Sequence, residues 1–232
     1  MRHKPRLSSL TLSLVLTVGV LGTNSRVWAR QAEPGLTLTL KVYNYAPTSE
    51  ETLIQAEKNV KRIFRKLGVD IAWLDVSVPS QERKAVTTNT QRLQPTLHPQ
   101  LRILIFPRSM TERLGRTQDA LGYAAPALEG QPTNVAYVFY HRVNQLAENL
   151  LRTGSSGTHS RVQILAHAIA HEIGHLLLPF DADSLHSPTG IMRAGWDQKD
   201  LHSLSRGQLT FTPQQGELIR TEIVRRRWAQ ER

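Results

Sequence analysis

The sequence predicts an α+β domain in which helices pack against a twisted, mixed β-sheet that has an edge strand. Three observations lead to this prediction. Residues 36–44 alternate apolar and polar side chains, which is typical of a half-buried strand. Residues 101–106 form a continuous apolar run, as expected of a central strand buried on both faces. Apolar residues recur at helical spacing over 49–67 and again in the residues before Pro179.

The first 29 residues have the layout of a secretory signal peptide. Basic residues precede an apolar run from Leu10 to Leu21, which is shorter than the roughly twenty residues that a membrane-spanning helix needs. Val27 and Ala29 suit the −3 and −1 positions of a cleavage site. We therefore expect an exported domain, residues 30–232, that is released to the periplasm or the medium without stable membrane insertion. An uncleaved N-terminal anchor is the alternative.

Composition narrows the class of protein further. Cysteine is absent, so neither disulfides nor thiolate metal ligands can stabilise this chain. The formal charge is +10, and removal of the four basic residues among residues 1–29, which contain no acid, leaves +6. Three arginines at 225–227 fall near the end of a predicted helix, where the helix dipole favours cations. Because no nucleic-acid-binding motif accompanies this charge, we expect no nucleic-acid partner.

One helix separates the first two predicted strands. It begins at Thr48 or Ser49, since hydroxyl side chains cap helix starts, and it ends at Gly68. The apolar side of this helix is expected to cover one face of the sheet. A second strand is predicted over 69–78, and the polar stretch 80–100, which contains prolines, is predicted as a loop.

Two more strands follow the central one, which Pro107 ends. A short strand over 121–125 is predicted to lie at the edge of the sheet, and a stronger strand is predicted over 135–140. The polar passage from there to Gly157 is rich in glycine and serine toward its end and is predicted as a connection.

Two helices complete the prediction. Ser160 and Gln163 have the spacing of a capping box, so a helix is predicted to start there and to end near Leu178, before Pro179. A last helix is predicted to start at Thr212. Its predicted buried side consists of Leu218, Ile219, Ile223, Val224 and Trp228.

The clearest candidate for a metal site is the segment 171–175, which reads His-Glu-Ile-Gly-His, an H-E-x-x-H motif. On a helix, His171 and His175 project from one face a single turn apart, so both imidazoles can reach one ion. A catalytic zinc site uses three protein ligands and keeps one position for water. Glu172 is rotated by roughly 100° from His171 and can act as general base on that water. The motif therefore predicts a single catalytic Zn²⁺.

With this motif, the order of the elements and the segment His186–Ala194, which reads H-S-x-x-G-I-M-R-A, the chain resembles the metzincin clan of zinc metallopeptidases. It also resembles small exported bacterial zincin-like proteins. The resemblance implies a zincin fold with an upper sheet lobe over about 36–178 and a lower lobe over about 179–232. It also implies a tight turn after Gly190 that places Met192 beneath the metal, and a third histidine ligand, for which His186 matches best.

The chain departs from the metzincin pattern at two positions. Metzincins have glycine seven residues after the first histidine and the third ligand at ten, where this chain has Leu178 and Asp181. A carboxylate can also bind zinc, so Asp181 competes with His186 for the third position, and Asp183 or another acid is a further alternative. His167 lies one turn before the motif, but three histidines on a straight helix span about 12 Å. We expect His167 to be packed and hydrogen-bonded.

The predicted function is that of an exported zinc-dependent endopeptidase that hydrolyses peptide or protein substrates. An extended substrate is expected to pair with the edge strand near Tyr123, if that strand borders the metal site. Trp196 is expected to be a packing residue. The alternative is a non-catalytic exported binding protein on the same scaffold, with a structural or vestigial metal site.

Overall fold

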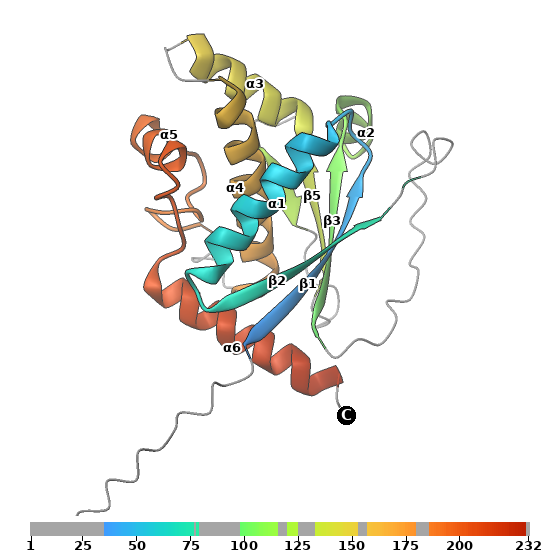
Figure 1. Ribbon diagram of the computed structural model, residues 1–232, viewed down its shortest axis with the longest axis vertical. Coiled ribbons are helices and arrows are strands. Elements are labelled where there is room, and N and C mark those ends of the chain that lie inside the picture. The colour runs from blue at the N-terminus through green and yellow to red at the C-terminus, as the bar shows by residue number, and fades with distance from the viewer. Residues whose placement is uncertain are drawn as a thin grey trace, which may run out of the picture. The chain divides into compact units, whose positions relative to one another are not determined.

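Five strands form a mixed, twisted sheet in the order β2-β1-β3-β5-β4 (Figure 1). Their bounds are β1 Leu36–Asn44, β2 Val69–Val76, β3 Gln100–Phe106, β4 Gly122–Ala124 and β5 Val135–Phe139. The pairs β1–β2, β1–β3 and β3–β5 are parallel, whereas β4 is antiparallel to β5. The predicted central strand and the predicted short edge strand are therefore confirmed.

The computed structural model describes residues 35–76, 78, 98–115, 120–124, 133–152, 157–179 and 186–230, all of which belong to one compact unit, Pro34–Arg232. The predicted signal peptide and nearly all of the predicted loop over 80–100 lie outside these residues. Among the described residues, no helix has the length and apolar character that crossing a membrane requires.

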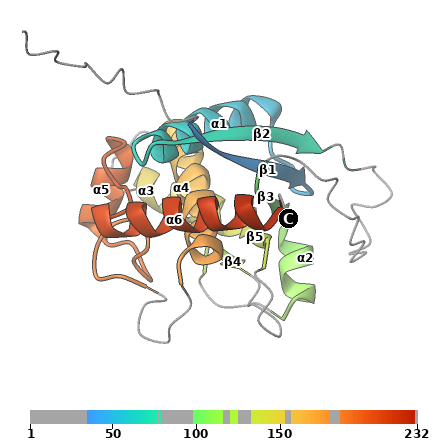
Figure 2. The same cartoon turned by 90° about the horizontal axis from the view of Figure 1, so that it is seen from below.

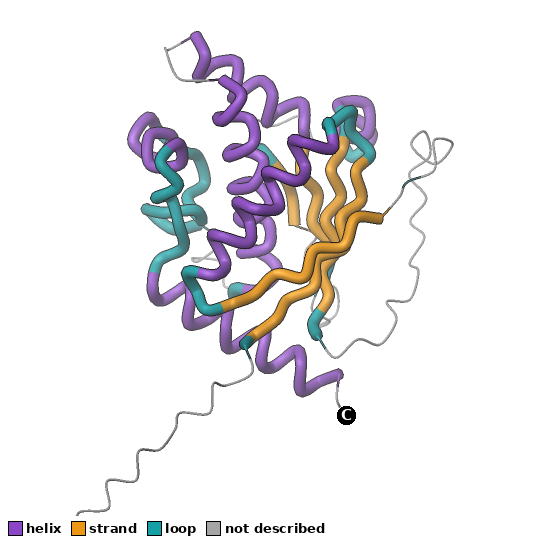
Figure 3. Tube along the Cα trace, viewed as in Figure 1, coloured by secondary structure: helices purple, strands orange, loops and turns teal. Residues whose placement is uncertain are grey.

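The described residues form six helices. Their bounds are α1 Glu50–Arg65, α2 Arg108–Arg113, α3 Tyr140–Arg152, α4 Gly157–Leu177, α5 Gln198–Ser205 and α6 Pro213–Gln230. Helices α1, α3 and α4 pack together on one face of the sheet (Figure 3). Helix α6 contacts both α4 and β1 and lies across their ends (Figure 2).

The main core lies between the sheet and helices α1 and α4. Alternate residues of β1 point into it, as the alternation in the sequence predicts. Strand β3 was predicted to be buried on both faces, but Arg102 and Leu104, on the face away from the main core, are only partly buried. Helix α1 begins where expected, because the Ser49 hydroxyl accepts a hydrogen bond from the Thr52 amide at 3.2 Å. Gly68, at φ +72°, makes the turn into β2. The buried side chains include Leu38, Leu40, Val60, Phe64, Leu101, Ile103, Ile164 and Ile169.

The expected connection after β5 is instead helix α3. Its buried residues, Tyr140, Val143, Ala147 and Leu150, recur at helical spacing, and this apolar stripe was hidden among polar residues. Helices α2 and α5 were also missed. Helix α5 has a clear sequence signal, because Asp197 and Asp200 form a reciprocal capping box at its start.

The predicted start of α4 is wrong. Helix α4 already begins at Gly157, so Ser160 lies inside it rather than at its cap. Gln163, the expected partner in the capping box, donates its side-chain amide to the carbonyl oxygen of Ser205 at 3.0 Å. Its role is thus to join α4 to the end of α5. The predicted end of α4, just before Pro179, is confirmed to within one residue.

The start of α6 is confirmed, but part of its predicted buried side is wrong. Thr212 and Gln215 exchange hydrogen bonds of 2.9 and 3.2 Å in a capping box. The residues that α6 buries are Gly216, Ile219 and Ile223. Leu218, Val224 and Trp228 are exposed, and Trp228 is 64% accessible. Each is rotated by 100° or more from Ile219 and from Ile223, because a helix turns about 100° per residue.

Two arginines near the end of α6 are engaged in ion pairs, and one of them also links α6 to other elements of the fold. Glu222 pairs with both Arg225 and Arg226 at 2.7 Å. Arg226 also donates to the carbonyl oxygens of Thr133, at 3.3 Å, and Leu176. A cation at the carbonyl end of α4 is favourable because these carbonyls lack partners within the helix. Arg226 therefore ties α6 to α4 and to the chain that enters β5.

Candidate metal centre

Helix α4 passes through the core, and its H-E-x-x-H motif lies in the turns that follow, beside a cleft. Every residue from Ile164 to Ala170 is buried, because α4 contacts α1, α3, α5, α6, β4 and β5. A helix that is buried all round is expected to be apolar all round, and His167 is the one polar residue of α4 in this stretch. Its polar residues follow in the next turns, where the helix reaches a cleft. The core therefore fixes the direction of the helix that carries the motif.

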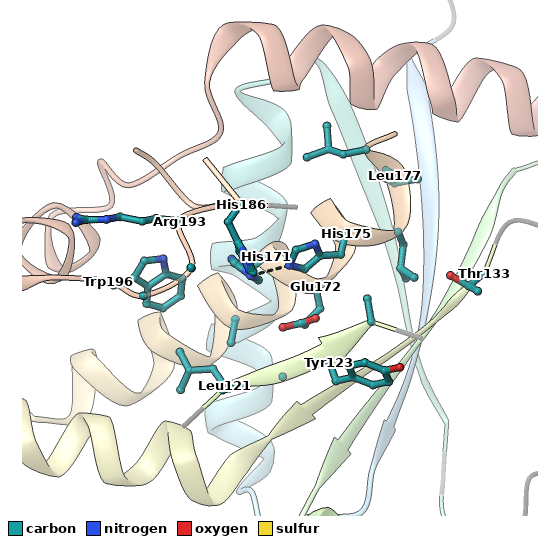
Figure 4. A pocket seen from close by; sticks show the side chains of 18 of the residues that line it. Leu121, Tyr123, Thr133, His171, Glu172, His175, Leu177, His186, Arg193 and Trp196 are labelled. Carbon is teal, nitrogen blue, oxygen red and sulfur yellow. Dashed lines mark hydrogen bonds between the residues drawn. The ribbon is translucent and has the colours of Figure 1, made fainter. Parts of the chain in front are cut away.

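Three imidazoles meet at this point (Figure 4). His171 and His175 lie one turn apart on α4, and His186 comes from the segment before α5. Their candidate ligand atoms all lie within 4.8 Å of one another, and the Nε2 atoms of His171 and His175 are 3.0 Å apart. Two nitrogens that share a tetrahedral zinc ion lie about 3.3 Å apart. The described residues thus bring together the three predicted histidines in a group that can hold a metal ion.

The orientation of His171 suits a metal ligand. Its Nδ1 lies 2.7 Å from the carbonyl oxygen of Ile191 and must donate a proton to it, since a carbonyl only accepts. In the neutral ring this leaves the lone pair of Nε2 free, facing His175 and His186. Burial lowers the pKa of His171 to about 4 and that of His175 to about 3, and it also lowers the pKa of His186. Neutral imidazole is the form that binds metals.

Glu172 lies between the histidines and strand β4 (Figure 4). Its side chain is almost fully buried, and burial raises its pKa to about 8, although a hydrogen bond from the Ala124 amide acts in the opposite direction. The Oε2 atom has no hydrogen-bond partner among the described residues. A buried carboxyl oxygen without a partner is costly, so it is poised to interact with a further polar group, such as water or a substrate.

Two glycines make room for this arrangement. A Cβ atom on Gly122 would lie 2.6 Å from both Glu172 Oε1 and the carbonyl oxygen of Tyr137. A Cβ atom on Gly174 would lie 2.3 Å from the sulfur of Met192. Strand β4 and the segment around Met192 can therefore approach α4 closely from two directions only because both positions lack a side chain.

The segment Gly190–Met192 makes a tight turn against α4. Gly190 has φ +78°, and the Arg193 amide donates to the Gly190 carbonyl at 3.2 Å. The Ile191 amide donates to the Thr210 carbonyl at 3.0 Å, which holds the turn to the segment before α6. Met192 is only 1% exposed. The turn therefore brings the Ile191 carbonyl to His171 and the Met192 sulfur to Gly174.

A cleft of about 1110 Å³ runs past the three histidines. Strand β4 lines one side of it, and helix α6 lines it with Leu218, Thr221 and Glu222 together with the two arginines described above. Helix α3 and the segment 193–196 also contribute. The three imidazoles and Glu172 therefore line the same cleft as the edge strand and α6.

The remaining candidates from the sequence take different positions. His167 is fully buried, and its ring nitrogens lie 2.7 Å from the Gln163 carbonyl and 3.2 Å from the Leu209 carbonyl. The expectation that it is a packed, hydrogen-bonded residue agrees with these contacts. Tyr123 stacks on Tyr137 with ring centroids 6.3 Å apart. Asp181 and Asp183, the alternative third ligands, lie outside the described residues.

Sequence reasoning missed two contributors to the site. Gly122 of β4 leaves room for the Glu172 side chain, and the backbone amide of Ala124 donates a hydrogen bond to it. A short strand carries no residue pattern that signals such contacts. Trp196 donates its indole N–H to the Ile191 carbonyl at 3.2 Å, so it contributes more than packing. Its position just after the conspicuous G-I-M segment is the one available signal.

No protein-family model and no curated protein matches this chain. Among solved structures, the chain is similar to the crystal structure of archaemetzincin from Methanopyrus kandleri, with a TM-score of 0.44 and 14% sequence identity. The alignment covers 83% of this chain and 99% of that chain.

The close contact at Gly174 predicts an unusual effect of alanine in a helix. Alanine favours a helix interior over glycine by about 1 kcal/mol. Gly174→Ala should nevertheless lower the free energy of unfolding by roughly 1–3 kcal/mol, because the added methyl overlaps Met192 and overpacks the core. Gly195→Ala is the control, since a Cβ atom there meets nothing within 4 Å. Denaturant unfolding of both variants tests this, and a Gly174→Ala variant as stable as the native chain would contradict it.

The raised pKa of Glu172 predicts a pH-dependent stability in protein stripped of metal by a chelator. Between the ordinary pKa of 4.5 and the folded value of about 8, the folded state binds the proton more tightly than the unfolded state. The contribution of Glu172 to stability therefore falls as pH rises through this window. Glu172→Gln should gain stability relative to the native chain from pH 5 to pH 8, on the order of a few kcal/mol at the upper end. The same difference in unfolding free energy between Glu172→Gln and the native chain at pH 5 and at pH 8 would exclude the effect.

Proposed function

We propose that this chain is a zinc-dependent endopeptidase in which His171, His175 and His186 hold the ion and Glu172 is the general base. The observation that carries this proposal is the convergence of three imidazoles beside a buried carboxyl group, one oxygen of which has no hydrogen-bond partner among the described residues. A purely structural zinc site needs a closed set of four ligands and no carboxylate aimed at a water position. The combination therefore favours catalysis over a structural metal site.

The donor set fits the proposed ion. Three nitrogen ligands with an open side toward a cleft match catalytic zinc, which takes three protein ligands and keeps a fourth position for water. When bound, the ion would activate this water and polarise the carbonyl group of a substrate. The hydrogen bond from His171 Nδ1 to the Ile191 carbonyl directs Nε2 toward the ion and fixes the tautomer.

Glu172 handles the protons in this proposal. The carboxylate takes a proton from the attacking water and passes it to the leaving amine. Its ionised form is disfavoured by burial and favoured by the Ala124 amide, and a cation close by would favour it further. Oε2 is the atom available for the proton, since the described residues offer it no hydrogen-bond partner.

Peptide is the substrate class that suits the walls of the cleft. Strand β4 is an edge strand that lines the cleft beside Glu172, so an extended peptide can pair with its backbone. Main-chain pairing of this kind accepts many sequences, because it does not depend on side chains. The side chain of Tyr123 is already stacked on Tyr137, which leaves the backbone of β4 as the recognition element.

We further propose roles for the N-terminal residues and for Met192. Residues 1–29 direct export and are removed near Ala29, and residues 30–232 are the catalytic domain. Met192 forms the floor of the metal site, as the metzincin resemblance implies. Its burial and its contact with Gly174 in α4 support this role.

The roles of base and ligand can be separated by one substitution at Glu172. Glu172→Gln should keep about one zinc per chain and lose turnover of a peptide library by at least about a hundredfold, because proton transfer is removed while the imidazoles stay. Zinc content by elemental analysis and peptide cleavage by mass spectrometry provide the two readouts. A native protein that binds zinc but cleaves no peptide would favour the non-catalytic binding protein instead.

The third ligand can be assigned by a matched pair of substitutions. His186→Ala should lose most of the zinc, since two imidazoles alone bind it weakly, whereas Asp181→Ala should retain it. Zinc affinity is measured by competition with a chromophoric chelator. Full zinc binding by His186→Ala, together with loss in Asp181→Ala, would transfer the third position to Asp181.

A further inference from the structure

The carbonyl group of Ile191 accepts two side-chain hydrogen bonds at the metal centre. One comes from His171 Nδ1 at 2.7 Å and the other from the indole nitrogen of Trp196 at 3.2 Å. A carbonyl oxygen has two lone pairs, so it can accept both bonds at the same time. The indole N–H can only donate, so its direction is unambiguous. The group that orients His171 is thus itself held by a second side chain.

The backbone around this carbonyl is fixed on its other side. The Ile191 amide donates to the Thr210 carbonyl at 3.0 Å, and Ile191 is fully buried. Gly190 lies so close to Thr210 that a Cβ atom would be 2.7 Å from its carbonyl oxygen. The peptide unit before Ile191 is therefore held against Thr210, and the carbonyl group of the unit after Ile191 is oriented by the two donors that meet it.

The indole ring of Trp196 is seated between two histidines of α4. Its ring is edge-on to His171 and to His167, with centroids 6.2 Å apart in both cases. His167 is fully buried and hydrogen-bonded, so it forms a rigid wall for the indole. Trp196 also lines the cleft.

We propose that Trp196 is a positioning residue of the metal centre, which acts through the Ile191 carbonyl to hold the His171 ring with Nε2 toward the ion. This inference rests on the proposed metal-binding function. It requires only that His171 is a ligand, and not that the chain cleaves peptides. Partners that orient a ligand in this way commonly change metal affinity by about 10–100-fold when they are lost.

The test uses two tryptophan variants that each lose a single indole hydrogen bond. Trp196→Phe keeps an aromatic ring between the histidines and removes the bond to Ile191. Trp73→Phe is the matched control, because the Trp73 indole donates to Asp75 on β2 at 2.9 Å, away from the residues that line the cleft. Full-length protein is titrated with Zn²⁺ against a chelator, and with Co²⁺ to record the visible absorption bands of the site.

We expect Trp196→Phe to weaken zinc binding by about tenfold and to shift or broaden the Co²⁺ bands, because the His171 ring is less well oriented. Trp73→Phe should match the native protein in both measurements. Unfolding curves of both metal-free variants show whether they lose similar stability. Trp196→Leu, which also removes the ring, should weaken zinc binding further.

Three outcomes would overturn the inference. The first is a Trp196→Phe variant with native zinc affinity and a native Co²⁺ spectrum. The second is an equal loss of affinity in Trp73→Phe, which would indicate general destabilisation. The third is a native protein that binds no zinc, which would overturn the proposed function as well. Zinc binding without peptide cleavage would refute only the enzymatic proposal. The titrations would still decide the role of Trp196.

Discussion

The structure depends on the burial of one helix, α4, which serves both as the centre of the core and as the carrier of the site. Its middle turns are enclosed by four further helices and by the sheet, and its last turns face the cleft. The same burial that stabilises the fold removes water from the motif. As a result the imidazoles of His171 and His175 stay neutral at physiological pH and the carboxyl group of Glu172 favours its protonated form. Fold stability and site chemistry therefore have one physical origin.

Much of the site is shaped by backbone and by missing side chains. Gly122 and Gly174 allow a strand and a turn to touch α4, and the carbonyl of Ile191 and the amide of Ala124 orient His171 and Glu172. Backbone groups have no rotamers, so they hold their partners with little loss of conformational entropy. The indole of Trp196 donates to one of these backbone groups, the Ile191 carbonyl, and its ring also packs edge-on against His171.

The sequence predicted those features that follow from local patterns. Alternation and apolar runs located the strands, and the H-E-x-x-H spacing located one face of α4. Helix α3 was missed because its buried stripe is interrupted by polar residues, and Trp228 was misplaced because residue type was given more weight than angular position on α6.

The position of His186 next to the motif does not follow from a local pattern. It depends on a turn that is hydrogen-bonded to Thr210, a contact between residues nineteen positions apart, and no local pattern encodes such a contact. The resemblance to metzincins suggested His186, but the spacing left Asp181 as a competing third ligand. Long-range backbone pairing of this sort is the part of the site that a single sequence does not reveal.

The contacts of Arg226 bear on the order in which the molecule can assemble during synthesis. The carbonyl end of α4, next to the second histidine of the motif, receives its cationic partner from a residue fifty positions further along the chain. A nascent polypeptide that has emerged only as far as α5 has the motif but lacks this stabilising contact. The end of α4 thus gains this stabilising contact only after the last helix has been completed.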